Sequence, residues 1–450
     1  MSITNQTSGL AIIMSSVFMF TTWAADTTSF VDIAISGYSN APDGGATITF
    51  DALLSKGDHD TLANDYNDTL TVVTAETVEE IAVLTSVESL EDVNRITITN
   101  AAISASSKSK IDVEATLYIS APTSTARFFK VLGAGKVVDL ESLTSGYLAQ
   151  DGDVLTGNNV GYHKITIADG ATVALKNATI SLSADNDLHA GITCLGDATI
   201  VIAGENIVNV QSGISRYPAI FAAENKTLTI KGTGSLTASS NGYSCGIGGG
   251  YGTDCGNIVI ESGIIRAIGS DRCAGIGSGG AHLNGDQGAY CGDITINGGI
   301  VHAYSPGGSG IGCGYGGICG NIVINGGEVL GDANYAGIGS AGYDSKCGDI
   351  VITGGLVSGR GGVNGPGVGA GCGGECGYVM ISGGSIYAYA GSDCAAIGSG
   401  REAVCGDITV KNTVSQVTVE KGYGPTYIGA GYNGSCGTVT IEDGVNLTEN

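Results

Sequence analysis

A Cys-Gly pair followed by alternating apolar residues recurs through the second half of the chain, with 28 to 36 residues between successive copies. A period in this range is typical of a solenoid, in which each repeat covers the apolar face of its neighbour. This repeat constrains the fold more than any other feature, because one such unit cannot form a core alone. The seven copies begin at Cys255, Cys291, Cys319, Cys347, Cys376, Cys405 and Cys436.

Each repeat divides into three short strands. In the copy that begins at Cys291, residues 293–296 alternate polar and apolar side chains, Gly298 and Gly299 turn the chain, and residues 300–304 form a second strand. A Gly-Ile-Gly segment at residues 310–312 supplies the third strand. Stacking such units predicts an all-β fold, a right-handed parallel β-helix of about ten rungs with three short strands per rung.

Uniform and variable columns separate a packed interior from a surface, because successive strand residues point to opposite faces. In the second strand, the second position is always β-branched, the fourth is always small, and the third and fifth vary. Its predicted interior column is Ile265, Val301, Val329, Val357 and Ile386. The predicted interior column of the first strand is Ile167, Ile202, Ile230, Ile260, Ile296, Ile324, Ile352, Ile381, Val410 and Ile441.

Changes in composition divide the chain into three parts. Residues 1–25 have an apolar core followed by Ala24 and Ala25, which is typical of a signal peptide, although no Lys or Arg precedes the core. Residues 26–157 have few glycine pairs and no cysteine, and they predict a β-rich N-terminal domain or cap over the end rung. Residues 158–450 are predicted to form the parallel β-helix repeat domain. We therefore expect a secreted or cell-surface protein with no integral membrane segment in the mature chain.

The chain is strongly acidic, with a net charge of −24 at pH 7. A nucleic acid or an anionic membrane surface requires a basic face, so neither is an expected partner. The acidity suits a solvated extracellular protein. It is also compatible with calcium, but the sequence places no calcium site, and it predicts no cofactor and no metal ligands.

Thirteen cysteines leave three interpretations open. Neighbours in the Cys-Gly column would lie about 4.8 Å apart, within disulfide range, and a pair within one rung, such as Cys313 with Cys319, is an equal alternative. The thiols can instead be small buried apolar groups. Zinc is poorly supported, because Cys372 and Cys376 have no second close pair and no nearby histidine.

No residue pattern predicts a catalytic site. The five histidines share no repeat column, which argues against a His-based triad. A β-helix glycoside hydrolase needs paired carboxylates, but the residue after Cys-Gly varies: it is Asp293, Asp349 and Asp407 in three rungs and Asn, Tyr or Thr in the others. A position filled so variably is typical of a turn or a strand edge, so no catalytic residue is assigned.

Tyrosine is the candidate binding residue, with 19 tyrosines against 7 phenylalanines and one tryptophan. Aromatic rings on a repeating face can stack on sugar rings while their hydroxyls add hydrogen bonds. The alternative is that tyrosine simply suits half-exposed strand and turn positions. The predicted carbohydrate-binding residues are Tyr251, Tyr315, Tyr343 and Tyr432 in the loops after Gly-Ile-Gly, and His302, Tyr304, Tyr387 and Tyr389 in the exposed columns of the second strand.

Three segments carry a family resemblance: AGIGSG at residues 274–279, CGDITINGG at residues 291–299, and KITIADGATVALKNATIS at residues 164–181. Together they resemble glycine-rich repeat proteins of bacterial cell surfaces that belong to the pectin-lyase-like parallel β-helix group. The resemblance covers roughly residues 150–450. It implies the fold and, because some relatives are described as carbohydrate-binding, a polysaccharide or surface glycan as partner.

These observations favour an exported, non-catalytic surface or adhesion protein that binds a glycan through a repetitive β-helix face. Two alternatives stay open. One is a polysaccharide lyase or glycoside hydrolase of the β-helix type. The other is a purely structural spacer or filament subunit, which would assemble end to end.

Overall fold

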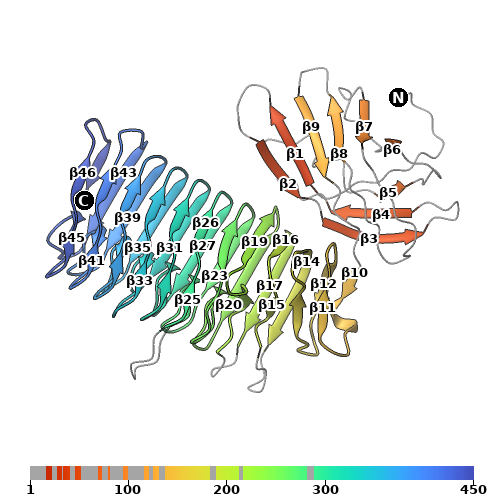
Figure 1. Ribbon diagram of the computed structural model, residues 1–450, viewed down its shortest axis with the longest axis horizontal. Helices are drawn as coiled ribbons and strands as arrows, with labels where there is room; N and C mark the ends of the chain where they lie inside the picture. Colours follow the sequence, from red (N-terminus) through yellow and green to blue (C-terminus); the bar gives the residue numbers. More distant parts are fainter. Residues whose placement is uncertain are drawn as a thin grey trace.

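The computed structural model of the protein describes residues 137–182, 189–211, 216–280 and 288–450 in full, together with the backbone of nine strands before them (Figure 1). The nine strands form two antiparallel sheets of six and three strands. The N-terminal part is therefore β-rich, as predicted. Its strands are β1 (Val17–Thr22), β2 (Thr28–Asp32), β3 (Ala34–Asn40), β4 (Ala46–Asp51), β5 (Thr69–Val72), β6 (Glu80–Ile81), β7 (Arg95–Thr99), β8 (Thr116–Ser120) and β9 (Thr125–Lys130).

The predicted leader falls partly in this region. Strand β1 lies within it and pairs antiparallel with β2 and β9. The other leader residues, including Ala24 and Ala25, lie outside the described residues. No helix in the described part of the chain is both long enough and apolar enough to cross a lipid bilayer.

From Val137 onward the described chain winds into a parallel β-solenoid of about nine rungs, close to the ten or so predicted (Figure 1). Strands of successive rungs pair in parallel, and β10 and β12 join the same sheet upstream of residue 158. The first and second strands of the rungs are β10 (Val137–Asp139), β12 (Val154–Asn158), β14 (Ala171–Leu182), β16 (Ala198–Ala203), β17 (Glu205–Val210), β19 (Thr227–Gly232), β20 (Ser235–Ser240), β22 (Asn257–Ile260), β23 (Ile264–Ile268), β26 (Ile294–Ile296), β27 (Ile300–Ser305), β30 (Ile322–Ile324), β31 (Glu328–Ala333), β34 (Ile350–Ile352), β35 (Leu356–Gly361), β38 (Val379–Ile381), β39 (Ser385–Ala390), β42 (Ile408–Val410), β43 (Gln416–Lys421), β46 (Val439–Ile441) and β47 (Leu447–Glu449).

The Gly-Ile-Gly segments form the third strand of the rungs from β21 onward, as predicted. This third sheet contains β11 (Tyr147–Ala149), β13 (Ile165–Ile167), β15 (Ile192–Cys194), β18 (Ile220–Phe221), β21 (Ile247–Gly248), β24 (Ile276–Gly277), β28 (Ile311–Gly312), β32 (Ile338–Ser340), β36 (Val368–Ala370), β40 (Ile397–Ser399) and β44 (Ile428–Gly429). The structure adds a fourth strand of two residues, which ends at the cysteine of the Cys-Gly motif. These strands are β25 (Tyr290–Cys291), β29 (Ile318–Cys319), β33 (Lys346–Cys347), β37 (Glu375–Cys376), β41 (Val404–Cys405) and β45 (Ser435–Cys436). The described helical structure is one 3-10 turn, η1 (Leu140–Ser142).

The interior column of the first strand is confirmed over the regular rungs. Its five central members pair with one another in register, and each is fully buried: Ile260, Ile296, Ile324, Ile352 and Ile381. In the last rung, Ile441 pairs with Val410 but is 39% exposed. The column therefore forms a continuous apolar stack up to that rung.

Two upstream members of the predicted column are wrong. Ile230 pairs with Ile200, whereas Ile202 lies opposite Gly232. Ile167 belongs to β13 in the third sheet, not to the first strand. The cause is that β16 is buried at four consecutive positions, so alternation of polar and apolar residues does not mark its inward face there.

Small residues recur at fixed positions of the repeat because a larger side chain would collide with the neighbouring backbone. A Cβ at Gly331, in the fourth position of a second strand, would meet the carbonyl oxygen of Gly337, at the entrance to the third strand. The second glycine of Gly-Ile-Gly is restricted further: Gly277 has a φ of 137°, and a Cβ there would collide with the carbonyl of Gly312 in the next rung. The repeated glycines therefore let the strands close around a narrow core.

The substitution Ile324→Asp tests the interior column. The carboxylate would be buried without a partner between Ile296 and Ile352, so we expect the free energy of unfolding to fall by about 3–5 kcal/mol. Val323→Asp places the same charge on the outer side of the same strand and should cost under about 1 kcal/mol. Thermal and denaturant melts compare the two variants, and equal melting would show that Ile324 is not interior.

Candidate functional site

A groove runs along the solenoid axis where the second strands of four successive rungs end. Its floor is one outward-facing column whose members pair in register: Asn209 on β17, Ser239 on β20, Ile268 on β23 and Tyr304 on β27. Because adjacent strands are about 4.8 Å apart, this column spans about 14 Å. The groove is therefore elongated in the direction of stacking.

The groove has a volume of about 510 Å³, within the usual range for small-molecule sites. Two tyrosines line it, Tyr304 and Tyr243, which are 42% and 39% exposed. Each can therefore offer ring surface to a ligand. The other lining residues are mostly small and polar: Gln211, Ser240, Asn241, Gly242, Gly269, Ser270, Asp271 and Pro306.

Hydrogen bonds fix part of this lining. The Ser239 hydroxyl donates to Asn209 Oδ1 at 2.9 Å. The Ser270 hydroxyl accepts from the backbone N–H of Ser244 at 2.9 Å and donates to its carbonyl at 3.0 Å. Asp271 is the one carboxylate among the lining residues that the structure describes, and its side chain is 65% exposed. The groove thus combines two aromatic rings with amide, hydroxyl and carboxylate groups.

Tyr243 is a site residue that the sequence analysis missed. It precedes its Gly-Ile-Gly strand, whereas the predicted loop tyrosines follow theirs, so no repeat column marks it. Its ring packs edge-on against Tyr251 with centroids 6.0 Å apart, and the Arg216 guanidinium lies 4.8 Å from the Tyr251 centroid. Tyr243 therefore connects the groove to the first of the predicted loop tyrosines.

Two further loop tyrosines belong to a second aromatic cluster. The rings of Tyr315 and Tyr343 are 4.9 Å apart and tilted by 32°, and Tyr335 packs edge-on against Tyr315 at 6.1 Å. The Arg272 guanidinium lies 5.6 Å from the Tyr315 centroid. Tyr343 is 58% exposed but Tyr335 only 9%, so Tyr343 is the main ring that this cluster presents to solvent.

The remaining predicted residues are divided among separate rungs. His302 and Tyr304 share β27, whereas Tyr387 and Tyr389 share β39, three rungs further along. Tyr432 follows β44 and is 52% exposed. The structure therefore brings the predicted residues together in small groups and not in one continuous aromatic stripe.

Tyr387 is the predicted residue most constrained by its neighbours. Its hydroxyl donates to Glu420 Oε2 at 2.7 Å, and the Arg360 guanidinium lies 5.9 Å from its ring centroid. Burial and the hydrogen bond to Glu420 raise the pKa of Tyr387 above its usual value. A ligand at this ring would compete with these existing contacts.

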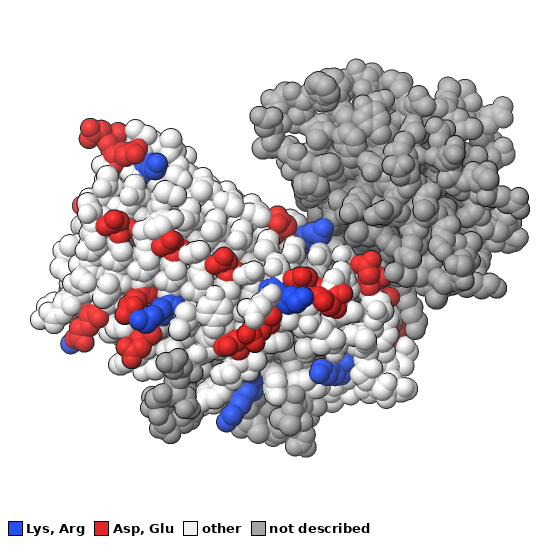
Figure 2. Space-filling view, in the orientation of Figure 1, with Lys and Arg blue, Asp and Glu red and all other residues white. Residues whose placement is uncertain are grey.

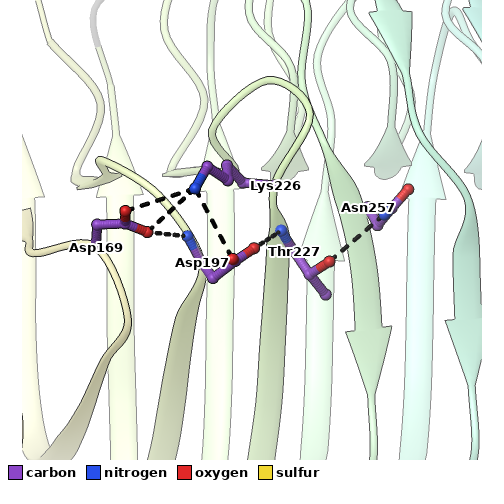
Figure 3. Close-up of polar contacts among 5 residues, drawn as sticks. All are labelled: Asp169, Asp197, Lys226, Thr227 and Asn257. Atoms are coloured by element: carbon purple, nitrogen blue, oxygen red, sulfur yellow. Dashed lines mark hydrogen bonds and ion pairs between the residues drawn. The ribbon is translucent and has the colours of Figure 1, made fainter.

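A ladder of polar side chains follows the corner before the first strand (Figure 3). Asp169 Oδ1 accepts from the backbone N–H of Asp197 at 2.9 Å, and Asp197 Oδ1 accepts from that of Thr227 at 2.8 Å. Lys226 Nζ lies 3.5 Å from Asp169 and 3.9 Å from Asp197. Asn257 Nδ2 then donates to the Thr227 hydroxyl at 3.4 Å. Each rung is thereby tied to the next at the start of the first strand, in addition to the backbone pairing.

The same ladder continues through the Cys-Gly rungs. In four successive rungs, the side-chain oxygen of the residue after Cys-Gly accepts a hydrogen bond from the backbone N–H of the equivalent residue in the next rung, at 2.7–3.0 Å. The four acceptors are Asn257, Asp293, Asn321 and Asp349. Asp407 accepts from Thr438 in the same way, at 2.7 Å. This geometry bears out a strand-edge role for the position, and Asn and Asp interchange because both supply the acceptor oxygen. Figure 2 shows acidic side chains recurring along one face of the solenoid.

Within the residues that the structure describes, no three His, Cys, Asp or Glu side chains are grouped so that they could hold a metal ion. No family model matches the chain, and comparison with curated proteins and with solved structures also gives no match. Function is therefore inferred from the geometry of the chain itself.

The substitution Asp349→Ala tests the ladder. It leaves the Tyr378 N–H without its acceptor, and we expect the free energy of unfolding to fall by about 1 kcal/mol. Asp349→Asn keeps an acceptor oxygen and should lose less. Asp332→Ala, which removes an outward carboxylate on β31, is the control. Denaturant melts measure all three, and an Asn variant as unstable as the Ala variant would contradict the ladder role.

Proposed function

We propose that this protein is an exported, non-catalytic surface protein that binds a neutral polysaccharide or surface glycan. The observation that carries the proposal is the groove, in which two half-exposed tyrosines lie among amide and hydroxyl side chains. The parallel β-solenoid is compatible with a surface protein. The apolar core and small residues of segment 1–25 support export.

The chemistry of the groove suits a sugar. The ring of Tyr304 or Tyr243 can stack on the apolar face of a pyranose. The amides of Asn209 and Asn241 and the hydroxyl of Ser240, which also line the groove, can donate to and accept from sugar hydroxyls. Because the groove follows four rungs, it can hold consecutive units of a chain and not only one ring.

Charge favours a neutral glycan over an acidic one. The chain has a net charge of −24, and the groove contains the exposed Asp271, whose Oδ2 lies 3.9 Å from Arg272 Nε. A uronic acid polymer would bring like charges together, which costs free energy at low ionic strength. A neutral polysaccharide carries no such penalty.

Binding without catalysis is supported by the same lining. Glycoside hydrolysis normally uses two carboxylates on either side of the scissile bond, whereas Asp271 is the one carboxylate among the described residues that line the groove. The ladder carboxylates Asp293, Asp349 and Asp407 accept backbone hydrogen bonds between rungs. The resemblance to glycine-rich surface repeat proteins of the pectin-lyase-like group adds weight to a binding role.

The predicted tyrosines outside the groove would extend the contact. Tyr251 touches Tyr243 at its end, and the exposed Tyr343 and Tyr432 offer rings on the loop edge further along. His302, Tyr315, Tyr387 and Tyr389 would contribute secondary contacts. We therefore place the strongest binding at Tyr243 and Tyr304.

A glycan array with the purified full chain identifies the ligand, and titration calorimetry then measures the variants. Tyr304→Ala and Tyr243→Ala should each weaken binding by about 0.5–1.5 kcal/mol, which corresponds to roughly 2- to 13-fold in Kd. Tyr423→Ala removes a ring that is 91% exposed and does not line the groove, and it should leave Kd unchanged.

Three results would count against the proposal. Binding that survives the Tyr243→Ala/Tyr304→Ala double variant would exclude the groove, and the combined Tyr315, Tyr343 and Tyr387 alanine variant would then show whether the loop edge binds instead. Preference for a polyuronate would contradict the charge argument. Release of reducing or unsaturated sugar ends by the wild type would make the protein an enzyme.

A further inference from the structure

The Cys-Gly cysteines form an interior column. Cys291, Cys319, Cys347, Cys376, Cys405 and Cys436 pair in register through the fourth sheet, and the first five are at most 7% exposed. All thirteen cysteines of the chain are free thiols in the structure. One cysteine outside the column, Cys313, follows the third strand β28 and points into it.

Cys313 and Cys319 are in unusually close contact. Their Sγ atoms are 2.7 Å apart, not far above the roughly 2.04 Å of a disulfide bond. Five residues separate them in the sequence, and both lie in the core, at 0% and 3% exposure. The two sulfurs therefore lie within reach of a bond between them.

Several other thiols point toward backbone groups. Cys245 Sγ lies 3.3 Å from the carbonyl oxygen of Gly277, Cys255 Sγ lies 3.6 Å from the same oxygen, and Cys291 Sγ lies 3.5 Å from that of Gly256. These contacts occupy the thiols as weak donors. Cys313 Sγ has a contact of the same kind, 3.1 Å from the carbonyl oxygen of Lys346, and in addition lies in direct sulfur–sulfur contact with Cys319.

Acidity also separates the two sulfurs. Burial raises the pKa of Cys313, but hydrogen bonds from Cys319 and Cys347 outweigh this and lower it to about 6. Burial and the hydrogen bond to Cys313 raise the pKa of Cys319 well above its usual value. Cys313 is thus the more acidic of the two thiols in the finished solenoid, and the thiolate is the attacking species in thiol–disulfide exchange.

We infer that Cys313 and Cys319 form a disulfide within one rung when the chain folds in an oxidising compartment. The Cys313 thiolate attacks a small-molecule disulfide, forms a mixed disulfide and releases one small thiolate. Cys319 then loses its proton to solvent, attacks Cys313 Sγ and displaces the second small thiolate, which takes up a proton. Two protein thiols are oxidised, and one small disulfide is reduced to two thiols.

The order of folding gives the oxidant access. Both sulfurs are covered in the finished solenoid, but the column is open at the growing end until the next rung, with Cys347, packs against it. The exchange therefore takes place before that rung is added, when Cys319 but not yet Cys347 lies beside Cys313 to lower its pKa. The resulting bond closes the loop between β28 and β29 and fixes the link between the third and fourth strands of this rung.

The test uses the full chain, folded in a buffer of oxidised and reduced glutathione. The protein is then unfolded in guanidinium with an alkylating agent, and its intact mass and peptide map are measured. We expect an intact mass that corresponds to the reduced chain less two hydrogens plus eleven alkyl groups, out of thirteen cysteines in the sequence, and one cross-linked peptide that joins Cys313 to Cys319. Reductant should lower the Tm of the wild type by several degrees.

Matched variants locate the bond. Cys313→Ser and Cys319→Ser should each give a protein with no cross-link whose Tm does not respond to reductant. Cys436→Ser, at the partly exposed end of the column, should keep the cross-link. Alkylation of all thirteen wild-type cysteines, or a cross-link between column neighbours such as Cys319 and Cys347, would overturn the inference. The wild-type map decides the question even if a serine variant fails to fold.

Discussion

Backbone hydrogen bonding between successive rungs is the constraint on which the rest of the structure depends. Each strand of a rung pairs in parallel with the equivalent strand of the next, in four separate columns, so no rung can satisfy its own backbone. Parallel pairing fixes the spacing at about 4.8 Å, and every repeated side chain then meets a copy of itself at that distance. Apolar side chains gain from this arrangement, because Ile324 packs between two further isoleucines. Like charges repeated at the same position are destabilising, because they repel one another at this distance.

The acidic corner shows how the chain avoids that loss. Asp293 and Asp349 are separated by Asn321 in the ladder, so carboxylates alternate with a neutral amide that has the same acceptor geometry. Where two carboxylates are adjacent, Asp169 and Asp197, Lys226 lies between them. The groove lies at the far end of the second strand from this corner. The outward-facing column there is uncharged from Asn209 to Tyr304. The solenoid thus combines an acidic corner with a locally neutral floor.

Sequence periodicity predicted the features that repeat. The stacked isoleucines, the Gly-Ile-Gly strand and the strand-edge role of Asp349 all follow from comparing rungs, because each rung is held by the same contacts as the next. Periodicity failed at two kinds of position. Ile202 was misplaced because β16 has a continuous buried run, which contains no alternation to set the register. Tyr243 was missed because it contributes to a groove through tertiary position and belongs to no column.

The groove itself could not be predicted for a related physical reason. Its shape depends on side chains from four rungs that differ at the same position: an amide, a hydroxyl, an aliphatic chain and an aromatic ring. Repeat analysis treats such a column as variable and assigns it to solvent, which is correct for each residue alone. The groove forms only because these four side chains of different size lie next to one another.

The axial direction of the groove has a mechanical consequence. Tension along the solenoid would load the interfaces between rungs in series, so the weakest interface would open first. A rigid glycan bound from Asn209 to Tyr304 would bridge three such interfaces at once. It would share the load with the backbone hydrogen bonds between those rungs. A surface protein built in this way would resist extension best along the stretch that its ligand occupies.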